Sequence, residues 1–402
     1  MPPGAAMNPG FAALQPYPFE RLRGLLADLR HDGGLPLIDL SIGEPRHAPP
    51  ALVRDALIGH LDGLGRYPKT AGSDDLRAAV AAWLQRRHGL PAGAVNPANQ
   101  VLPVSGTREA LFAIAQCVVD RAPGARVAMP NPFYQIYEGA ALLAGAQPLY
   151  IPCPAAASYQ PDFEAVPAAA WRDVQLLYIC SPHNPTGRVL TLDQLKSLVG
   201  LAQRHDFVIA SDECYSEIYP DDDAPPPGIL AACRALGLDA FDRCLVFQSL
   251  SKRSSVPGLR SGFVAGDARL IERFLLYRTY HGCALPEYVQ AASAAAWHDE
   301  AHVTASRALY RRKLAAAVEA LSPRVELPQG GFCLWLPVPG GDDLAFTRRL
   351  YAHWHLRVLP GSFLARAQAG INSGAGHVRL ALVADEADCA QAMARLASAL
   401  ND

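Results

Sequence analysis

The chain has 402 residues, of which 50% are hydrophobic and 18% charged, and its formal net charge is −2 at pH 7. This composition is typical of a globular protein and excludes a disordered or fibrous one. The near-neutral charge argues against a nucleic-acid partner, and the lack of a long apolar stretch argues against a membrane span. Nine scattered cysteines without a CxxC pair, and an N-terminus without signal-peptide features, predict a cytoplasmic protein.

The N-terminal hundred residues are predicted to form three helices and one strand. Apolar residues at helical spacing indicate an amphipathic helix within residues 11–31. A strand is predicted within 35–45, followed by helices at about 50–62 and 74–89, the second with Ser73 as its N-cap.

From residue 101 onward, short apolar strands alternate with helices. The predicted strands are 101–104, 126–130, 147–153, 174–180, 207–211 and 244–248. The intervening helices include 107–120, 135–144 and 191–205. This alternation indicates a mainly parallel sheet with helices on both faces. Because such sheets bind ligands beyond the carboxyl ends of their strands, we expect functional residues just after each strand.

After residue 267, long helices precede a second alternation of strands and helices, which predicts a smaller α+β unit. Long helices are expected at 268–280, 286–298 and 301–321, and strands and helices then alternate to residue 399. The predicted fold class is therefore α/β, with two domains and an N-terminal arm that contributes to the smaller domain. The predicted boundaries are 1–47 for the arm, 48–299 for the large domain and 300–402 for the small domain.

One lysine follows the predicted strand at 244–248, in the stretch SLSKRSSVPGLR (249–260). A lysine at a strand end can be partly desolvated, which favours condensation with an aldehyde. Hydroxyl groups and a guanidinium bind phosphate, and Ser249 and Arg260 flank Lys252. The stretch therefore indicates a site for a phosphorylated aldehyde such as pyridoxal 5'-phosphate, although a surface loop with a solvated lysine has the same pattern.

Two further motifs place polar side chains after neighbouring strands. SPHNPTG (181–187) puts the amide of Asn184 within reach of a ligand, or simply forms a tight turn. In SDECYSE (211–217), Asp212 can keep a pyridine nitrogen protonated while Tyr215 donates to a ring oxygen. An N-cap aspartate beside a half-buried tyrosine would have the same pattern.

Two other segments give weaker signals. The backbone amides of Gly106, Thr107 and Arg108 would lie at a helix N-terminus, where anions bind, but many helices begin this way without a ligand. Tyr134, in NPFYQIY (131–137), could cover a flat ring, although aromatic residues at helix starts usually belong to the core.

In combination, these motifs resemble those of the class I and II aminotransferases, which are fold-type I pyridoxal-phosphate enzymes. The resemblance extends from about residue 8 to the C-terminus and is carried by NPTG, DECY and SLSK…PGLR. It implies that Lys252 holds the cofactor covalently and acts as catalytic base and acid. It also implies that Asp212 pairs with the pyridine nitrogen and that Tyr134 stacks on the ring.

The resemblance also implies roles for the remaining residues. Asn184 and Tyr215 would bind the ring oxygen, and the phosphate would be bound by Gly106, Thr107, Arg108, Ser249 and Arg260. Tyr67, in YPKTAG, resembles the tyrosine that reaches the cofactor of a neighbouring subunit, which implies a homodimer. Gly43 and Arg379, together with Asn184, would bind the substrate α-carboxylate.

Stretches outside these motifs, among them MNPGFAALQPYPFERLR and YRTYHGCALP, resemble the succinyldiaminopimelate aminotransferases of lysine biosynthesis. They imply N-succinyl-LL-2,6-diaminopimelate as amino donor and 2-oxoglutarate as keto acid acceptor. One departure is His183, because SPGNPTG is the commoner form of that motif. Position alone suggests Tyr17, Arg46 and the 280–285 segment for the distal end of the donor.

Other interpretations share parts of the pattern. An aminotransferase for aspartate, alanine, kynurenine or an aromatic amino acid, or a pyridoxal-phosphate β-lyase, would carry the same cofactor motifs. A transcription regulator would need an added DNA-binding region, and the segment before Gly43 is short and not basic. His298 and His302 have the spacing of a zinc-binding helix, but Asp299 replaces the expected glutamate, so both are predicted to be exposed helix positions.

Overall fold

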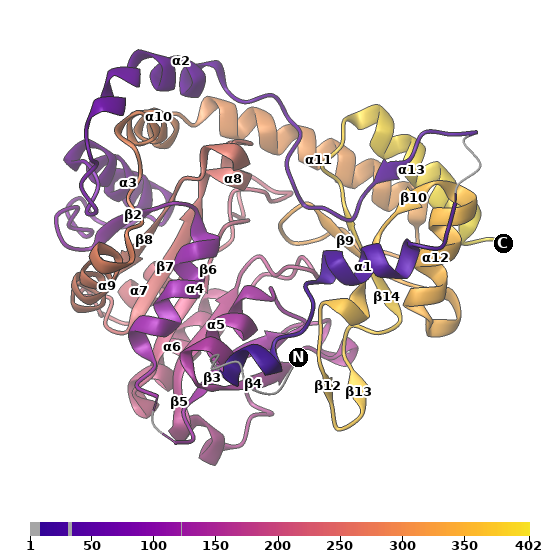
Figure 1. Ribbon diagram of the computed structural model, residues 1–402, viewed down its shortest axis with the longest axis horizontal. Helices are drawn as coiled ribbons and strands as arrows, with labels where there is room; N and C mark the ends of the chain where they lie inside the picture. Colours follow the sequence, from indigo (N-terminus) through magenta and orange to yellow (C-terminus); the bar gives the residue numbers. More distant parts are fainter. Residues whose placement is uncertain (1–8, 31–33, 122) are drawn as a thin grey trace.

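The computed structural model describes residues 9–30, 34–121 and 123–402. Its largest element is a seven-stranded sheet in the order β2-β8-β7-β6-β5-β3-β4 (Figure 1). The strands are β2 (Val101–Val104), β3 (Arg126–Asn131), β4 (Gln147–Pro152), β5 (Val174–Cys180), β6 (Val208–Asp212), β7 (Cys244–Ser249) and β8 (Gly262–Gly266). Of these strands, β8 runs antiparallel to both of its neighbours and the other pairs are parallel, so the sheet is mainly parallel, as predicted.

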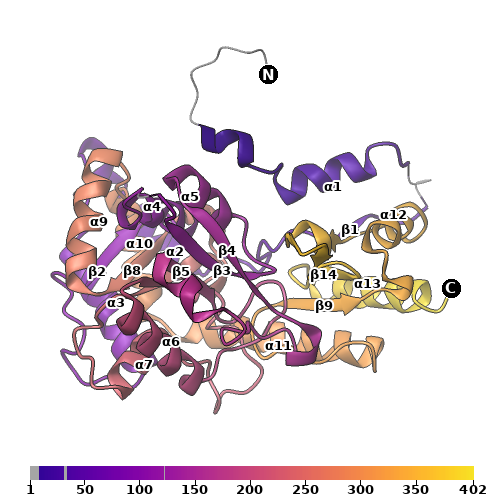
Figure 2. The ribbon, with the colours of Figure 1, turned by 90° about the horizontal axis from the view of Figure 1, so that it is seen from below.

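Helices cover both faces of this sheet (Figures 1 and 2). One face carries α4 (Thr107–Val118), α5 (Ile136–Ala144) and α9 (Ala268–His281). The other carries α3 (Asp74–Arg87), α6 (Leu192–His205), α7 (Ile229–Ala235) and α10 (Glu287–His298), with α2 (Ala51–Gly59) packed on α10. Successive residues of each strand enter opposite cores, as Ile209 and Ala210 of β6 do, because strand side chains alternate between faces. The α/β fold class is confirmed.

The C-terminal part of the chain is built around a separate core. Its strands are β1 (Ile38–Asp39), β9 (Cys333–Pro337), β10 (Leu356–Arg357), β11 (Leu359–Pro360) and β14 (His377–Ala381). The apolar faces of α11 (Ala301–Leu321), α12 (Asp343–Trp354) and α13 (Glu386–Ala399) pack against them. β1 pairs in parallel with β10, so the N-terminal segment joins this part of the fold. The domain boundaries themselves stay a prediction.

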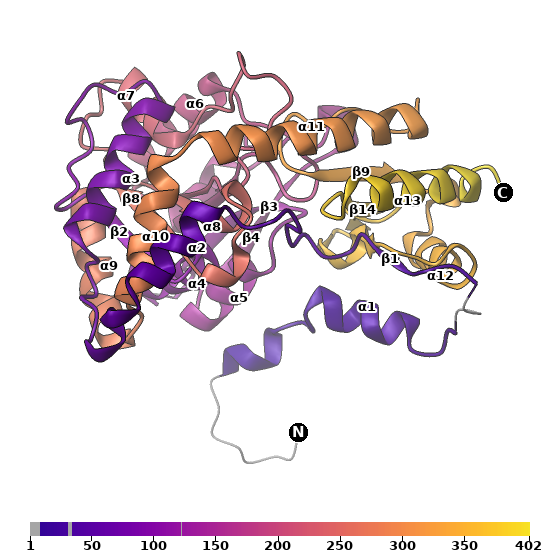
Figure 3. The same cartoon turned by 90° about the horizontal axis from the view of Figure 1, so that it is seen from above.

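The N-terminal helix is shorter than predicted. Within the expected range of 11–31, whose last residue lies outside the described residues, α1 spans Pro18–Leu26 after a 3-10 turn at Pro9–Ala13. Prolines separate the two because proline has no N–H for a helix interior. Figures 2 and 3 show this segment running alongside the molecule, and it contacts both α5 and α12. The N-terminal segment therefore contacts both the part built on the large sheet and the C-terminal part.

A hairpin of β12 (Ala367–Gln368) and β13 (Ile371–Asn372) was not predicted. Among the residues that the structure describes, no helix has the length and apolar character that a bilayer span requires.

Candidate active site

A cavity of about 600 Å³ lies between the carboxyl ends of β5, β6 and β7 and the C-terminal strands β11 and β14. Eleven of the thirteen residues predicted for the site line it: Gly43, Thr107, Arg108, Tyr134, Asn184, Asp212, Tyr215, Ser249, Lys252, Arg260 and Arg379. Gly106 lies directly behind Arg260, and Tyr67 is 101% exposed on the loop before α3. Parallel strands bring segments that are far apart in the sequence to one edge of the sheet.

Lys252 lies on α8 (Leu250–Arg253), a single helical turn directly after β7. Ser249 caps this turn, its Oγ accepting a hydrogen bond from the backbone N of Ser251 at 3.1 Å. The Lys252 Nζ donates to the carbonyl of Gly43. Burial lowers the pKa of Lys252 to about 8, and the nearby charge of Arg379 adds to this effect. About a tenth of the amine is therefore uncharged at pH 7, far more than for an ordinary lysine, and the uncharged form is the one that acts as a nucleophile or a base.

Asp212, the last residue of β6, is a buried carboxylate. Its Oδ2 accepts a hydrogen bond from the Tyr137 hydroxyl at 2.7 Å, and its Oδ1 accepts one from the Cys214 backbone N at 3.3 Å. Burial raises the pKa of Asp212, whereas these hydrogen bonds and the charge of Lys252 act in the opposite direction. No ion-pair partner lies within 4.0 Å in the described part of the chain, so a ligand cation would compensate this charge.

Arg379 is 6% exposed and fixed on β14. Its Nη2 donates to the Ser41 carbonyl at 2.6 Å and its Nη1 donates to the Asn184 Oδ1 at 3.0 Å. Its Nε is buried and has no hydrogen-bond partner among the described residues. An unpaired guanidinium donor beside a polar cavity suits a ligand carboxylate. Gly43 lies on the same cavity, where a side chain would crowd the Phe332 ring because its Cβ would lie 3.1 Å from that ring.

Aromatic side chains form another wall of the cavity. The Tyr134 hydroxyl accepts a hydrogen bond from the Arg108 Nε at 2.8 Å, and the Arg108 guanidinium lies 5.9 Å from the centroid of the Tyr17 ring. Burial raises the pKa of Tyr215, so its hydroxyl stays a hydrogen-bond donor. Of the positions suggested for the distal end of the donor, Tyr17 lines this cavity, whereas Arg46 and the 280–285 segment do not.

The N-terminus of α4 faces Arg260 and the serines of SLSKRSS. Thr107 begins the helix, and Gly106 before it has φ +83°, which favours glycine. Any Cβ at Gly106 would collide with the Arg260 guanidinium. Helix N–H groups, a guanidinium and the hydroxyls of Ser249 and Ser251 together suit a phosphate.

These groups fit pyridoxal 5'-phosphate. Lys252 matches the aldehyde, Asp212 the ring nitrogen, and Arg260 with the α4 N-terminus the phosphate. Tyr137 and Ser251 were missed by the sequence analysis, although both lie inside motifs that it singled out. Phe332 packs against Tyr215 and against the Lys252 amine, and nothing in the sequence indicated it.

His183 lies behind the cavity and holds the NPTG loop by hydrogen bonds. Its Nδ1 bonds to the Thr186 Oγ1 at 2.8 Å and its Nε2 to the Pro132 carbonyl at 3.1 Å. Burial lowers the pKa of His183 to about 4, so the ring is neutral. This histidine therefore replaces the commoner glycine without entering the site.

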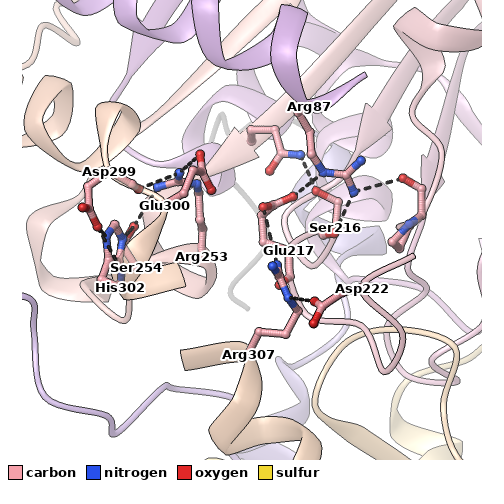
Figure 4. A network of polar contacts seen from close by, with 12 residues as sticks. Arg87, Ser216, Glu217, Asp222, Arg253, Ser254, Asp299, Glu300, His302 and Arg307 are labelled. Atoms are coloured by element: carbon pink, nitrogen blue, oxygen red, sulfur yellow. Dashed lines mark hydrogen bonds and ion pairs between the residues drawn. The ribbon is translucent and has the colours of Figure 1, made fainter. Parts of the chain in front are cut away.

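The prediction that both histidines of HDEAH are exposed was wrong for His302. Its ring nitrogens bond to the Asp299 Oδ2 at 2.5 Å and to the Ser254 Oγ at 2.8 Å (Figure 4). His298 is exposed, as expected. The described residues contain no group of three or more His, Cys, Asp or Glu side chains suited to a metal ion.

A mainly parallel α/β sheet with a desolvated lysine, a buried aspartate and an anion site around one cavity defines a fold-type I pyridoxal-phosphate enzyme. Residues 36–396 match the model of the family aminotransferase class I and II, and the chain belongs to this family, whose cofactor is pyridoxal 5'-phosphate. The chain is 37% identical over 363 residues to the 4-dedimethylamino-4-oxo-anhydrotetracycline transaminase of Streptomyces rimosus, covering 90% of this chain and 93% of that protein. It is 30% identical to the LL-diaminopimelate aminotransferase of Dehalococcoides mccartyi, covering 96% of both.

Solved structures agree with this assignment. An aminotransferase from Neisseria meningitidis superposes with a TM-score of 0.93 at 47% identity, covering 98% of this chain and 100% of that one. A protein from Thermus thermophilus, named as a probable N-succinyldiaminopimelate aminotransferase, superposes with a TM-score of 0.84 at 26% identity, covering 95% and 100%. The chain is therefore an aminotransferase, and its donor is the open question.

Proposed function

We propose that this protein transfers an amino group between N-succinyl-LL-2,6-diaminopimelate and 2-oxoglutarate, in diaminopimelate and lysine biosynthesis in the cytoplasm. The observation that carries the proposal is that one cavity joins the Lys252 amine, the Arg379 guanidinium, whose Nε has no hydrogen-bond partner among the described residues, and the Arg108 side chain. The names of the Thermus and Dehalococcoides proteins support a donor of this type.

The residues that line the cavity share the tasks of catalysis in this proposal. The bound cofactor supplies an electron sink next to the substrate α-carbon. Lys252 holds the cofactor and moves the proton at that carbon, for which a pKa of about 8 is suited. Asp212 keeps the ring nitrogen charged, Asn184 and Tyr215 donate to the ring oxygen, and Tyr134 packs on the ring. The phosphate is bound by Gly106, Thr107, Arg108, Ser249 and Arg260.

Two arginines bind the carboxylates of the substrates in this proposal. Arg379, held by Asn184 beside Gly43, binds the α-carboxylate that donor and acceptor share. Arg108, held by Tyr134 against Tyr17, lies on the same cavity. The donor and 2-oxoglutarate both carry a carboxylate far from the reacting carbon, and Arg108 is the group we assign to it in addition to its backbone role.

A homodimer completes the site in this proposal. Tyr67 is fully exposed, and the apolar side chains of Ile58, Leu61 and Leu64 just before it are 57%, 40% and 70% exposed. Contiguous exposed apolar residues are typical of an interface. Tyr67 would then reach the cofactor phosphate of the neighbouring subunit.

A donor panel with 2-oxoglutarate tests the substrate directly. We expect kcat/KM to be highest for N-succinyl-LL-2,6-diaminopimelate, compared with LL-diaminopimelate, acetylornithine, aspartate, alanine, kynurenine and aromatic amino acids. LL-diaminopimelate is the strongest competitor because several relatives carry that name. A clear preference for any other donor would refute the substrate proposal, and elimination from a sulfur amino acid without keto acid would indicate a β-lyase.

A further inference from the structure

The residue after Lys252 is anchored at the junction between α10 and α11 (Figure 4). The Arg253 side chain is 0% exposed, and its Nη1 donates to the Ala296 carbonyl at 2.7 Å. Its Nη2 donates to the Glu300 Oε1 at 2.7 Å and to the Asp299 carbonyl at 3.2 Å. A fully buried guanidinium is costly unless its donors are paired. Both Nη atoms of Arg253 are paired and only its Nε has no partner among the described residues, so these contacts fix Arg253 in one orientation.

The next residue, Ser254, is held by the same junction. Because the Asp299 carboxylate can only accept, the Nδ1 of His302 donates to it, and the Nε2 then accepts from the Ser254 hydroxyl. This connectivity also occurs in Ser-His-Asp hydrolases. Here Ser254 is 1% exposed and does not line the active-site cavity, so it has no access to a substrate. The contacts position the backbone instead.

The junction also connects the site to the C-terminal part. α11 begins at this junction, and its far end packs into the core formed by the C-terminal strands, one of which carries Arg379. Near its start, Arg307 donates to the Glu217 carbonyl at 3.1 Å and to the Asp222 Oδ1 at 2.9 Å (Figure 4). Glu217 lies five residues after Asp212. One helix is thus tied to the segments that carry Lys252 and Asp212.

We propose that the junction formed by Asp299, Glu300 and His302 is a positioning site for Lys252. By holding Arg253 and Ser254, it fixes the Lys252 amine relative to Asp212 and Arg379. α8 is only one turn long and cannot maintain its conformation without tertiary contacts. The inference rests on the role proposed above for Lys252, and Arg253 and Ser254 act as positioning residues, not catalytic ones.

Three variants test this inference: Arg253→Gln, which loses the forked guanidinium without adding an amine, Ser254→Ala and His302→Gln. The control is Arg312→Gln, on the same helix, which removes an exposed ion pair with Glu386. We expect kcat to fall about 10- to 100-fold in the three variants, with a small change in KM, because small displacements of a reacting group are costly. The control should keep its kcat.

A second readout needs neither donor nor cofactor. The chain has four lysines, Lys69, Lys196, Lys252 and Lys313, so labelling by an amine reagent can be followed for each one by mass spectrometry. In the cofactor-free protein, the pH midpoint for Lys252 should be near 8 in the wild type and the control, and should rise toward 10.5 in the variants as water reaches the amine. A midpoint that stays near 8 in all three variants overturns the inference, whatever their melting temperatures. Ser254→Ala removes one oxygen atom and is the variant least affected by misfolding. A wrong donor assignment leaves this readout unaffected.

Discussion

At the residue scale, the chemistry depends on buried charges that lack a full set of partners. Lys252 has a pKa of about 8 because burial disfavours its charged form. Arg379 keeps one buried donor unpaired among the described residues. Both features cost folding free energy. They become useful when the aldehyde of the cofactor meets Lys252 and the carboxylate of the substrate meets Arg379.

Arg379→Lys tests the carboxylate assignment. A lysine keeps the positive charge but cannot reproduce the two-pronged contact. Since charged hydrogen bonds contribute about 1.5–3 kcal/mol, we expect kcat/KM for donor and acceptor to fall about 10- to 100-fold. Steady-state kinetics with both substrates checks this result. Arg357→Lys, in an ion pair with Asp39 outside the cavity, is the matched control. Unchanged saturation by both substrates would remove Arg379 from the site.

The motifs predicted the residues whose chemistry is visible in the sequence. Lys252, Asp212 and Asn184 follow strands, so the rule for parallel sheets was sufficient to bring them together. Ser41 and Phe332 were not predictable, because their contacts with Arg379 and Lys252 arise from packing between distant segments. Of the residues suggested for the distal end of the donor from position alone, Tyr17 lines the cavity and Arg46 does not, and the role of Tyr17 stays a prediction.

At the element scale, the NPTG loop depends on a neutral histidine. Burial holds the pKa of His183 at about 4, below the ordinary value of 6.5. The folded state therefore binds fewer protons than the unfolded one in this range. The resulting stability is complete above pH 6.5 and is lost as the pH falls through 4.

His183→Gly restores the commoner loop sequence and tests this account. At pH 7 we expect a loss of about 1–3 kcal/mol of unfolding free energy, because two hydrogen bonds to the loop and to Pro132 disappear. At pH 5 the difference from the wild type should shrink by up to about 2 kcal/mol. Urea unfolding at both pH values measures this, with exposed His298→Asn as control. A difference independent of pH would contradict the neutral, buried histidine.

Element positions followed largely from the hydrophobic pattern, whereas several helix ends, such as those of α1 and α2, differed from the prediction. β5 spans 174–180, as predicted, because a mostly apolar run is bounded by Asp173 and Ser181. The β12–β13 hairpin was missed, since two-residue strands carry no recognisable pattern. The exposed Asp222 pairs with Arg307 and Arg311 of α11, a contact between distant segments that periodicity does not indicate.

At the scale of the whole molecule, α11 and the N-terminal segment connect the large sheet with the C-terminal strands, and the cavity lies between these two parts. The sequence predicted both parts, but not the strand order β2-β8-β7-β6-β5-β3-β4, which depends on long-range pairing. The predicted site residue Tyr67 is fully exposed and does not line the cavity of this chain.

Mixing two impaired variants at a cofactor concentration that does not saturate Tyr67→Ala tests the proposed dimer. Tyr67→Ala and Lys252→Ala should each impair the homodimer, the first by about 10- to 100-fold in cofactor affinity for a lost charged hydrogen bond. In a hybrid dimer, one site would combine an intact Lys252 with an intact Tyr67 from the partner. Activity should therefore return after the two proteins are unfolded together and refolded. A mixture no more active than its components would place Tyr67 outside the neighbouring site.

The most direct measurement is the absorbance and amino-transfer activity of Lys252→Ala with bound cofactor, beside Lys196→Ala, whose lysine forms an exposed pair with Asp193. The account predicts that Lys196→Ala is indistinguishable from the wild type. Lys252→Ala should lose both the absorbance of the covalently held cofactor and turnover. A coloured, active Lys252→Ala protein would contradict the central claim.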